Sequence, residues 1–367
     1  MAAHAADDAE RVRAIVDDAI RPLMARHAIP GMAVGVTQGN RTFVFTYGIA
    51  SKEPRAPVTG DTLFEIGSVS KTLTATLAAY ANATGRLALT DHPGQHVPAL
   101  KGTPIDRVTL LHLGTYTAGG LPLQFPNAVS DDAAALSYFR AWKPQAAAGT
   151  RRLYSNPSLG LFGLAAAGAL GEPFAEAMET RVFPAFGMAR SHVHVPPDAM
   201  KDYAWGYRED QAVRVNPGAL DEETYGIKTT AGDLLRFVQA NLDPSRLDEA
   251  MRRAVAATQV GHFRSGPLVQ GLGWEQYAYP PTRERLLSGN SETMILQPQP
   301  AEQLTATPRG ARLYNKTGST NGFGAYVAFV PARRLGIVML ANRNYPIPAR
   351  VETAWALLER LAPSAHR

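Results

Sequence analysis

The spacing of apolar residues changes along the chain, and each period predicts a different element. Residues 9 to about 28 carry apolar side chains every three or four positions, which predicts an amphipathic helix. The segments 32–36 and 42–47 are rich in β-branched and aromatic residues, and Gln38-Gly39-Asn40 separates them. Two such segments around a glycine-containing turn predict a β-hairpin.

The rest of the chain is helical in its middle and strand-like towards its end. Residues 73–82 have helical spacing with Gly85 as a stop signal, and proline, glycine and short helical patterns dominate from about 86 to 200. In the C-terminal third we predict strands at 312–317, 325–330 and 335–341, a turn at 331–334 and a final helix from about 349 to 361.

This order of elements predicts an α/β (α+β) fold in which helices flank an antiparallel sheet. We expect residues 9–65 and 205–362 to form one sheet domain from both ends of the chain. Residues 66–204 are expected to form an inserted, mainly helical region, with the active site between the two parts.

Composition excludes several classes of protein. The 367 residues, 45% of them hydrophobic and 19% charged, suit a large globular core rather than a disordered chain. The sequence contains no run of about 18 apolar residues, so it predicts no membrane-spanning helix. The net charge is +5, but pairs such as Arg252-Arg253 are too short to form a nucleic-acid surface. We therefore expect no nucleic-acid or membrane partner, and a monomer.

The chain has no cysteine, which excludes disulfides, thiolate metal sites and a cysteine nucleophile. The stretch from Ala3 to Asp8 is similar to the small-residue end of a secretory cleavage site, or is simply an alanine-rich start. We interpret the chain as a mature, exported protein of the periplasm.

Three short motifs carry candidate chemistry. In Ser68-Val69-Ser70-Lys71, a serine hydroxyl and a lysine amine stand one helical turn apart, and a lysine with a lowered pKa can activate a serine. Tyr154-Ser155-Asn156 offers a phenol for proton relay and an amide for substrate. Lys316-Thr317-Gly318-Ser319 ends a predicted strand with groups that suit an anion. Singly, each motif also fits a helix surface, a turn or an edge strand.

Together and in this order the motifs are specific, and the chain resembles the class C serine β-lactamases of the penicillin-recognising serine acyl-transferases. The resemblance runs from about Ile29 to Leu361. It rests on Phe64-Glu65-Ile66-Gly67-Ser68-Val69-Ser70-Lys71, Thr115 to Gln124, Tyr154-Ser155-Asn156-Pro157-Ser158, Asn315-Lys316-Thr317-Gly318 and Ala341 to Pro346.

The resemblance implies an enzyme that hydrolyses cephalosporins and penicillins and confers antibiotic resistance. Ser68 would be the acylated nucleophile, and Lys71, Tyr154 and Lys316 its catalytic partners; which of Lys71 and Tyr154 takes the serine proton stays open. The backbone N–H groups of Ser68 and Ser319 would form the oxyanion hole.

The same resemblance implies the substrate-binding residues. An amide side chain of the substrate would meet Gln124 and Asn156, Tyr225 would form an aromatic wall, and the substrate carboxylate would lie near Lys316. The remaining residues implied at that end are Thr317, Gly318, Asn344 and Arg350. No cofactor or metal is expected, since His192 and His194 have metal-like spacing but lack further ligands.

Other functions remain open alongside this one. D-alanyl-D-alanine carboxypeptidases, β-lactamase-like esterases and non-hydrolytic penicillin sensors share the serine, tyrosine and lysine groups. Class A enzymes fit less well, because they carry Ser-Asp-Asn where this chain has Tyr154-Ser155-Asn156.

Two segments near the site carry a further expectation each. Many class C sequences read Asn-Tyr-Pro-Asn near the C-terminus, whereas this chain has Ile347 in place of the second asparagine. Ile347 either borders the pocket or packs beneath the last helix. Ser288 to Ser291 either borders the pocket or forms a plain turn.

Overall fold

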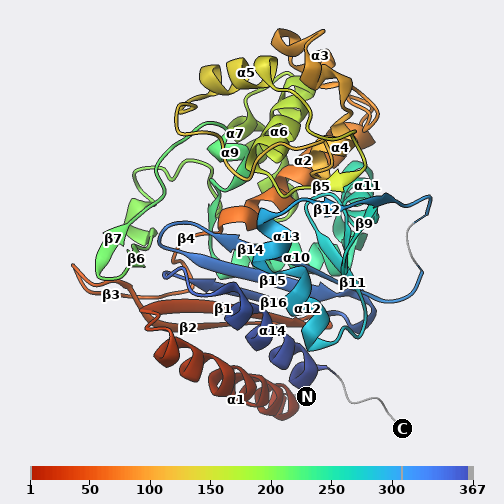
Figure 1. The fold of residues 1–367 in the computed structure, drawn as a ribbon. Helices are drawn as coiled ribbons and strands as arrows, with labels where there is room; N and C mark the ends of the chain where they lie inside the picture. Colours follow the sequence, from red (N-terminus) through yellow and green to blue (C-terminus); the bar gives the residue numbers. More distant parts are fainter. Residues whose placement is uncertain (1, 307–308, 363–367) are drawn as a thin grey trace.

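An antiparallel sheet of ten strands forms the centre of the computed structural model, which describes residues 2–306 and 309–362 (Figure 1). In spatial order the strands are β13 (Glu302–Gln303), β9 (Phe263–Ser265), β10 (Leu268–Gln270), β11 (Glu275–Ala278), β14 (Arg312–Ser319), β15 (Gly324–Val330), β16 (Leu335–Ala341), β1 (Gly31–Gln38), β2 (Arg41–Ser51) and β3 (Ala56–Pro57). Strands from the two ends of the chain meet where β1 pairs with β16.

Both faces of the sheet are covered by helices. The terminal helices α1 (Ala2–Arg26) and α14 (Ile347–Leu361) lie together on one face, and α10 (Ala231–Leu242) packs on the other (Figure 1). Side chains of β16 alternate accordingly, with Ile337 and Met339 in the core of the first face and Val338 and Leu340 in the core of the second. Because both faces are covered, the strand reads in the sequence as a continuous apolar segment rather than as an alternation of apolar and polar residues.

The middle of the chain is mainly helical and has its own apolar core. Figure 1 shows α3, α5 and α6 on the side of the sheet opposite α1 and α14. The helices are α2 (Ser70–Ala83), α3 (Pro93–His96), α4 (Leu110–Gly114), α5 (Asp132–Ala141), α6 (Asn156–Leu170), α7 (Phe174–Ala177), α8 (Phe183–Ala185) and α9 (Asp221–Thr224). The remaining helices are α11 (Glu249–Thr258), α12 (Arg283–Gly289) and α13 (Glu292–Leu296).

Short elements complete the fold. The short strands pair as β5 (Arg151–Arg152) with β12 (Gln299–Pro300), β4 (Phe64–Glu65) with β8 (Lys228–Thr229), and β6 (Gly206–Arg208) with β7 (Gln211–Val213). Single turns of helix are η1 (Gly67–Val69), η2 (Pro98–Leu100), η3 (Pro104–Arg107), η4 (Met178–Val182), η5 (Met200–Asp202), η6 (Pro244–Arg246) and η7 (Pro331–Arg333).

The predicted fold is confirmed in its main parts. The hairpin, the three C-terminal strands and the first and last helices are all present, although α1 begins at Ala2 rather than at residue 9 and α14 begins two residues early, at Ile347. The prediction lacks the helices α10 and α11 and the short strands β9 to β11 and β13. These strands have two to four residues, too few to establish a period of two. The division into a sheet domain and an inserted region stays a prediction.

One observation bears on the expected absence of a membrane partner. Among the described residues no single helix is long and apolar enough to span a bilayer, and Asn156–Leu170 passes that test only when joined to Phe174–Ala185 across a bend of 75°.

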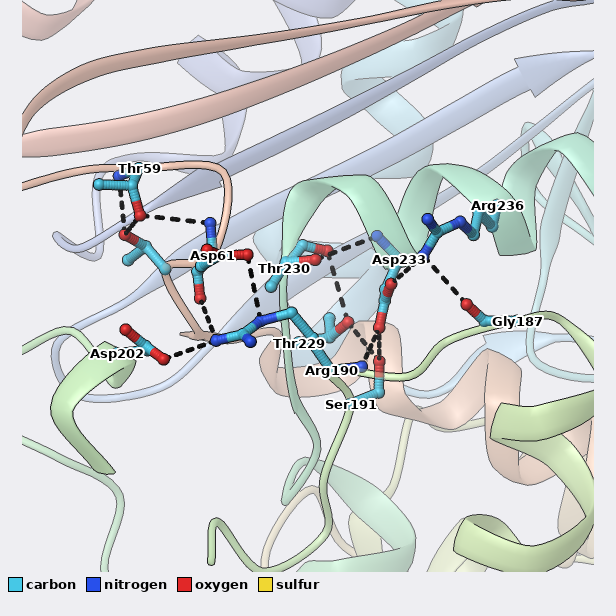
Figure 2. A network of polar contacts seen from close by, with 11 residues as sticks. Thr59, Asp61, Gly187, Arg190, Ser191, Asp202, Thr229, Thr230, Asp233 and Arg236 are labelled. Atoms are coloured by element: carbon cyan, nitrogen blue, oxygen red, sulfur yellow. Dashed lines mark hydrogen bonds and ion pairs between the residues drawn. The ribbon is translucent and has the colours of Figure 1, made fainter. Parts of the chain in front are cut away.

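A buried carboxylate fixes the first turn of α10 to its surroundings (Figure 2). Asp233, 2% exposed, accepts hydrogen bonds from the Arg190 backbone N–H at 2.6 Å and from the Ser191 hydroxyl at 3.0 Å. It also pairs with the Arg236 guanidinium at 2.6 Å, while the Thr230 hydroxyl caps the helix by accepting from the Asp233 N–H. These bonds tie the chain around residue 190 to the helix that covers the sheet.

We predict that Asp233→Ala lowers the free energy of unfolding by about 2–4 kcal/mol, because the buried Ser191 hydroxyl and the part-buried Arg190 N–H lose their acceptor. Urea denaturation measures the loss. Asp61→Ala is the matched control: Asp61 is 67% exposed and pairs with the same Arg190 at 3.3 Å, so its loss should stay below about 1 kcal/mol. Equal losses in the two variants would contradict the prediction.

Candidate active site

A cavity of about 490 Å³ brings most of the predicted site residues together. Its walls come from η1, the start of α6, strand β14 and the segment that leads into and out of α9. The predicted residues that line it are Ser68, Gln124, Tyr154, Asn156, Tyr225, Lys316, Thr317, Ser319 and Asn344. Residues separated by hundreds of positions thus share one polar space.

Ser68 lies where two chain segments meet backbone to backbone. Gly67 has φ +50, and a Cβ there would stand 2.5 Å from the Ser319 nitrogen. A Cβ at Gly318 would stand 1.9 Å from the Ile66 oxygen. Only glycine permits such an approach, so both glycines are required for η1 to pack directly against the end of β14.

Lys71 lies directly behind Ser68, one turn into the helical segment that η1 and α2 form. Its Nζ atom donates to Ser68 Oγ at 2.8 Å and to the Thr224 carbonyl oxygen at 2.8 Å, and the side chain is fully buried. Burial, together with the charge of Lys316, lowers the pKa of Lys71 to about 8. The amine is therefore mostly protonated at pH 7, with about a tenth in the basic form, and loses its proton just above neutral pH.

Tyr154 stands between two ammonium groups. Lys316 Nζ lies 4.8 Å from the centre of its ring and Lys71 Nζ lies 5.5 Å from it. Burial alone raises the pKa of the phenol, but the charges of Lys316 and Lys71 outweigh that effect and bring the pKa down to about 8. The next residue, Ser155, caps α6 by accepting from the Ser158 N–H at 3.0 Å, which fixes the phenol at the helix start.

The polar side chains across the cavity hold one another. Asn156 Nδ2 donates to Gln124 Oε1 at 2.8 Å, and the Asn156 N–H donates to the Leu123 carbonyl oxygen at 2.9 Å. Lys316 Nζ donates to the Thr317 carbonyl oxygen at 3.1 Å. These groups are held in place before any substrate arrives.

Arg350 and Gly318 do not line the cavity, in contrast to the other predicted contacts. The Arg350 side chain is fully buried and donates to the Gly318 carbonyl oxygen at 2.6 Å, to Ser319 Oγ at 2.9 Å and to Asn344 Oδ1 at 2.6 Å. Burial lowers the pKa of its guanidinium to about 10, so the group remains charged near neutral pH. It supports the end of β14 and Asn344 from behind.

The cavity wall contains a buried ion pair, Arg152 with Glu275, that the sequence did not predict. Arg152, 1% exposed, donates to Glu275 at 3.0 Å and to Gln270 at 2.8 Å, and its guanidinium carbon lies 5.8 Å from the centre of the Tyr154 ring. Arg151 is exposed and Arg152 is buried, and nothing in the sequence around the two arginines predicts this difference.

The cavity is also lined by residues from the two segments whose positions the sequence left open, 288–291 and Ile347. Gly289 and Asn290 line the wall, so the segment from Ser288 borders the pocket. Ile347 also lines it, while half-buried against the core beneath α14. Both alternatives for Ile347 are therefore partly correct. In residues 2–306 and 309–362 no group of three histidine or acidic side chains is arranged to hold a metal ion.

Comparisons with known proteins agree on one family. A family model described as "Beta-lactamase" matches residues 16–362. A β-lactamase of Pseudomonas fluorescens is 49% identical over 95% of this chain and 99% of its own. A class C β-lactamase solved with cefoxitin is 46% identical, with a TM-score of 0.92, over 96% of this chain and 99% of that one. A D-alanine carboxypeptidase from Burkholderia cenocepacia is 49% identical, with a TM-score of 0.91 and the same coverage.

The two ammonium groups predict an unusually acidic tyrosine. An ultraviolet difference titration of the phenolate should show one early transition near pH 8, assigned to Tyr154 by its absence from Tyr154→Phe. Buried tyrosines such as Tyr116 and Tyr277 have raised pKa values and should not contribute there.

Removing the charge of Lys316 tests whether the neighbouring cations lower the pKa of Tyr154. Lys316→Met should move the early transition to higher pH, because burial then dominates the pKa of Tyr154. Lys143→Met, which removes an exposed lysine, is the control and should leave the transition in place. A transition near pH 8 that survives Tyr154→Phe would overturn the assignment.

Proposed function

Because the chain belongs to the beta-lactamase family, we propose that it hydrolyses the β-lactam ring of cephalosporins and penicillins through an acyl-serine intermediate. The observation that carries the proposal is the 2.8 Å contact between Lys71 Nζ and Ser68 Oγ beside Tyr154 and Lys316. A serine hydroxyl becomes a nucleophile only with a base at hydrogen-bond distance. Such an enzyme protects its host against these antibiotics.

Acylation begins with attack of Ser68 Oγ on the β-lactam carbonyl carbon, while the serine proton passes to Lys71 or Tyr154. Both groups have pKa values lowered to about 8, which suits a general base near neutral pH. The oxyanion accepts hydrogen bonds from the N–H groups of Ser68 and Ser319. Collapse of the intermediate breaks the carbonyl–nitrogen bond, and Tyr154 delivers a proton to the nitrogen.

Deacylation reverses these proton transfers with water as the nucleophile. Water attacks the ester carbonyl, its proton passes to the same pair of Lys71 and Tyr154, and Ser68 Oγ leaves as the restored hydroxyl. The mechanism therefore uses each basic group twice and needs no additional residue.

Substrate binding follows from the cavity walls. Gln124 and Asn156 take the amide of the substrate side chain, and Tyr225 forms a wall beside it. Lys316, with Thr317 and Asn344, faces the substrate carboxylate. Since Arg350 lies behind Asn344, we assign it an indirect role, through its hydrogen bonds to Asn344 and Ser319.

The second candidate is a D-alanyl-D-alanine carboxypeptidase. One observation favours it: a solved relative that is 49% identical is described as a D-alanine carboxypeptidase. Both reactions use the same acyl-serine and differ in how fast water clears each acyl group. Turnover of a D-alanyl-D-alanine peptide and of a β-lactam by the same preparation compares them directly.

We also propose that the enzyme works as a monomer in the periplasm. The proposed nucleophile, its basic partners and the proposed substrate contacts all belong to one chain, which suits catalysis by a monomer. The absence of cysteine suits a compartment that oxidises thiols. Fractionation of expressing cells and the mass in solution test the two statements.

The chromogenic cephalosporin nitrocefin tests the function. We expect multiple turnovers by the wild type and none by Ser68→Ala, and a slowly released β-lactam should add its mass only to the peptide that contains Ser68. Ser70→Ala is the matched control, because Ser70 is the neighbouring serine and is buried. This variant should turn over nitrocefin and be labelled as the wild type is, since the label is not on Ser70. A single stoichiometric burst would favour a carboxypeptidase or a penicillin sensor, and a label on another serine would exclude Ser68.

Ile347 predicts a selective effect on substrates. Ile347→Asn adds a donor at the carboxylate end of the cavity, and a hydrogen bond to a charged acceptor is worth about 1.5–3 kcal/mol when desolvated. Because Ile347 is half-exposed, we expect the lower end, a change in kcat/KM of about 10-fold for some substrates and little for others. Kinetics with cephalosporins that differ beside the carboxylate measure it. Ile347→Val, which adds no donor, is the control; equal changes for all substrates would contradict the prediction.

A further inference from the structure

Glu65 is a buried carboxylate that the proposed mechanism does not use. It stands in β4, three residues before Ser68, and is 2% exposed. Its Oε1 atom accepts from the Tyr203 hydroxyl at 2.6 Å and from the Val215 N–H at 2.7 Å, and its Oε2 atom accepts from the Thr320 hydroxyl at 2.5 Å. One side chain therefore binds three segments that are distant in sequence.

Two of these segments carry cavity residues. Thr320 directly follows Ser319, and both line the cavity. Val215 and the next residue, Asn216, line it too, at the start of the segment that leads to Tyr225. The carboxylate thus connects the strand with the predicted oxyanion donor to the segment with the aromatic wall.

The third segment makes the connection rigid. Tyr203 is buried, and the Arg214 guanidinium lies 3.9 Å from the centre of its ring and donates to the Ala204 carbonyl oxygen at 3.2 Å. Arg214 immediately precedes Val215. Val215 is therefore held by Glu65, and Arg214 is held by the loop that contains Tyr203.

The position of the Thr320 bond relative to Ser68 gives it a consequence for the site. Gly67 and Ser319 make the close backbone approach, Glu65 lies two residues before Gly67, and Thr320 lies one residue after Ser319. The Glu65–Thr320 bond therefore lies beside the contact that sets the distance between the Ser68 and Ser319 N–H groups. Sliding of β14 along η1 would break it.

We propose that Glu65 is a positioning residue that holds the Ser319 N–H in register with Ser68 and fixes the segment from Val215 to Tyr225 over the cavity. The oxyanion role of Ser319 rests on the proposed function. Glu65 touches no substrate, so its effect passes through Thr320 and Val215.

Asp233 offers a comparison for a purely structural role. It too is a buried carboxylate with donors from separate residues, Arg190, Ser191 and Arg236 (Figure 2). None of these three residues lines the cavity. Loss of Asp233 should therefore lower stability without changing the chemistry of folded molecules.

The test compares Glu65→Met, Glu65→Gln and Asp233→Ala. Glu65→Met keeps the length of the side chain but accepts no strong hydrogen bond, and we expect kcat for nitrocefin to fall about 10-fold, with KM changed less than about 3-fold. Complete loss of an oxyanion donor costs about 10²- to 10³-fold, so displacement should cost less. Glu65→Gln retains an acceptor and a partner for the Thr320 hydroxyl and should stay within about 3-fold of the wild type.

A second measurement reports on the oxyanion site itself. Phenylboronic acid forms a tetrahedral adduct with a nucleophilic serine, and one adduct oxygen takes the place of the oxyanion. Its affinity should fall by the same factor as kcat in Glu65→Met and in Thr320→Val, which removes only the Thr320 hydroxyl. Asp233→Ala should lower the melting temperature and leave both quantities unchanged per folded molecule.

The outcomes separate the two proposals. If Glu65→Met lowers only the melting temperature, as Asp233→Ala does, Glu65 is merely structural and the inference is wrong. If Glu65→Met does not fold, Thr320→Val decides: a parallel loss of kcat and boronic-acid affinity supports the inference, and wild-type values overturn it. If the wild type fails to turn over nitrocefin, the proposed function fails, while boronic-acid affinity still tests the positioning by Glu65.

Discussion

Two ammonium groups share a buried space with one phenol beside Ser68, and the rest of the site is arranged around their electrostatic cost. Burial penalises each charge and the two cations repel one another, so the cluster opposes folding. Carbonyl oxygens of Thr224 and Thr317 accept from Lys71 and Lys316, and both ammonium groups lie within 6 Å of the centre of the Tyr154 ring. These contacts offset part of the cost, and the pKa values of Lys71 and Tyr154 are both lowered to about 8.

Backbone contacts rather than long side chains set the geometry around this cluster. Gly67 and Gly318 let η1 and β14 approach more closely than any other residue would allow. The buried pair of Arg152 and Glu275 supplies the wall behind Tyr154 with two charges that neutralise each other. The site therefore combines tight backbone packing with one neutralised ion pair, while the buried charges of Arg350 and Glu65 contact only neutral hydrogen-bond partners.

The sequence predicts the parts of this arrangement that depend on local pattern. Short apolar segments between turn residues reveal β15 and β16, and the spacing of Ser68 and Lys71 on one helical turn reveals the nucleophile. Arg152 and Glu275 leave no such signal, because their contact joins positions 123 residues apart. The burial of Arg350 is equally hidden, since an arginine near a predicted anion site reads the same whether it faces the ligand or supports the strand behind it.

The pairing of β1 with β16 has a consequence for the order in which the chain can fold. The Gly31 N–H donates to Asn342 Oδ1, a partner 311 residues further along the chain. The central sheet therefore cannot close until β16 has left the ribosome, and contacts of such high sequence separation form slowly. Until β16 is available, β1 lacks its partner on one side, and the β1–β2 hairpin exposes an unpaired strand edge at what becomes the middle of the sheet.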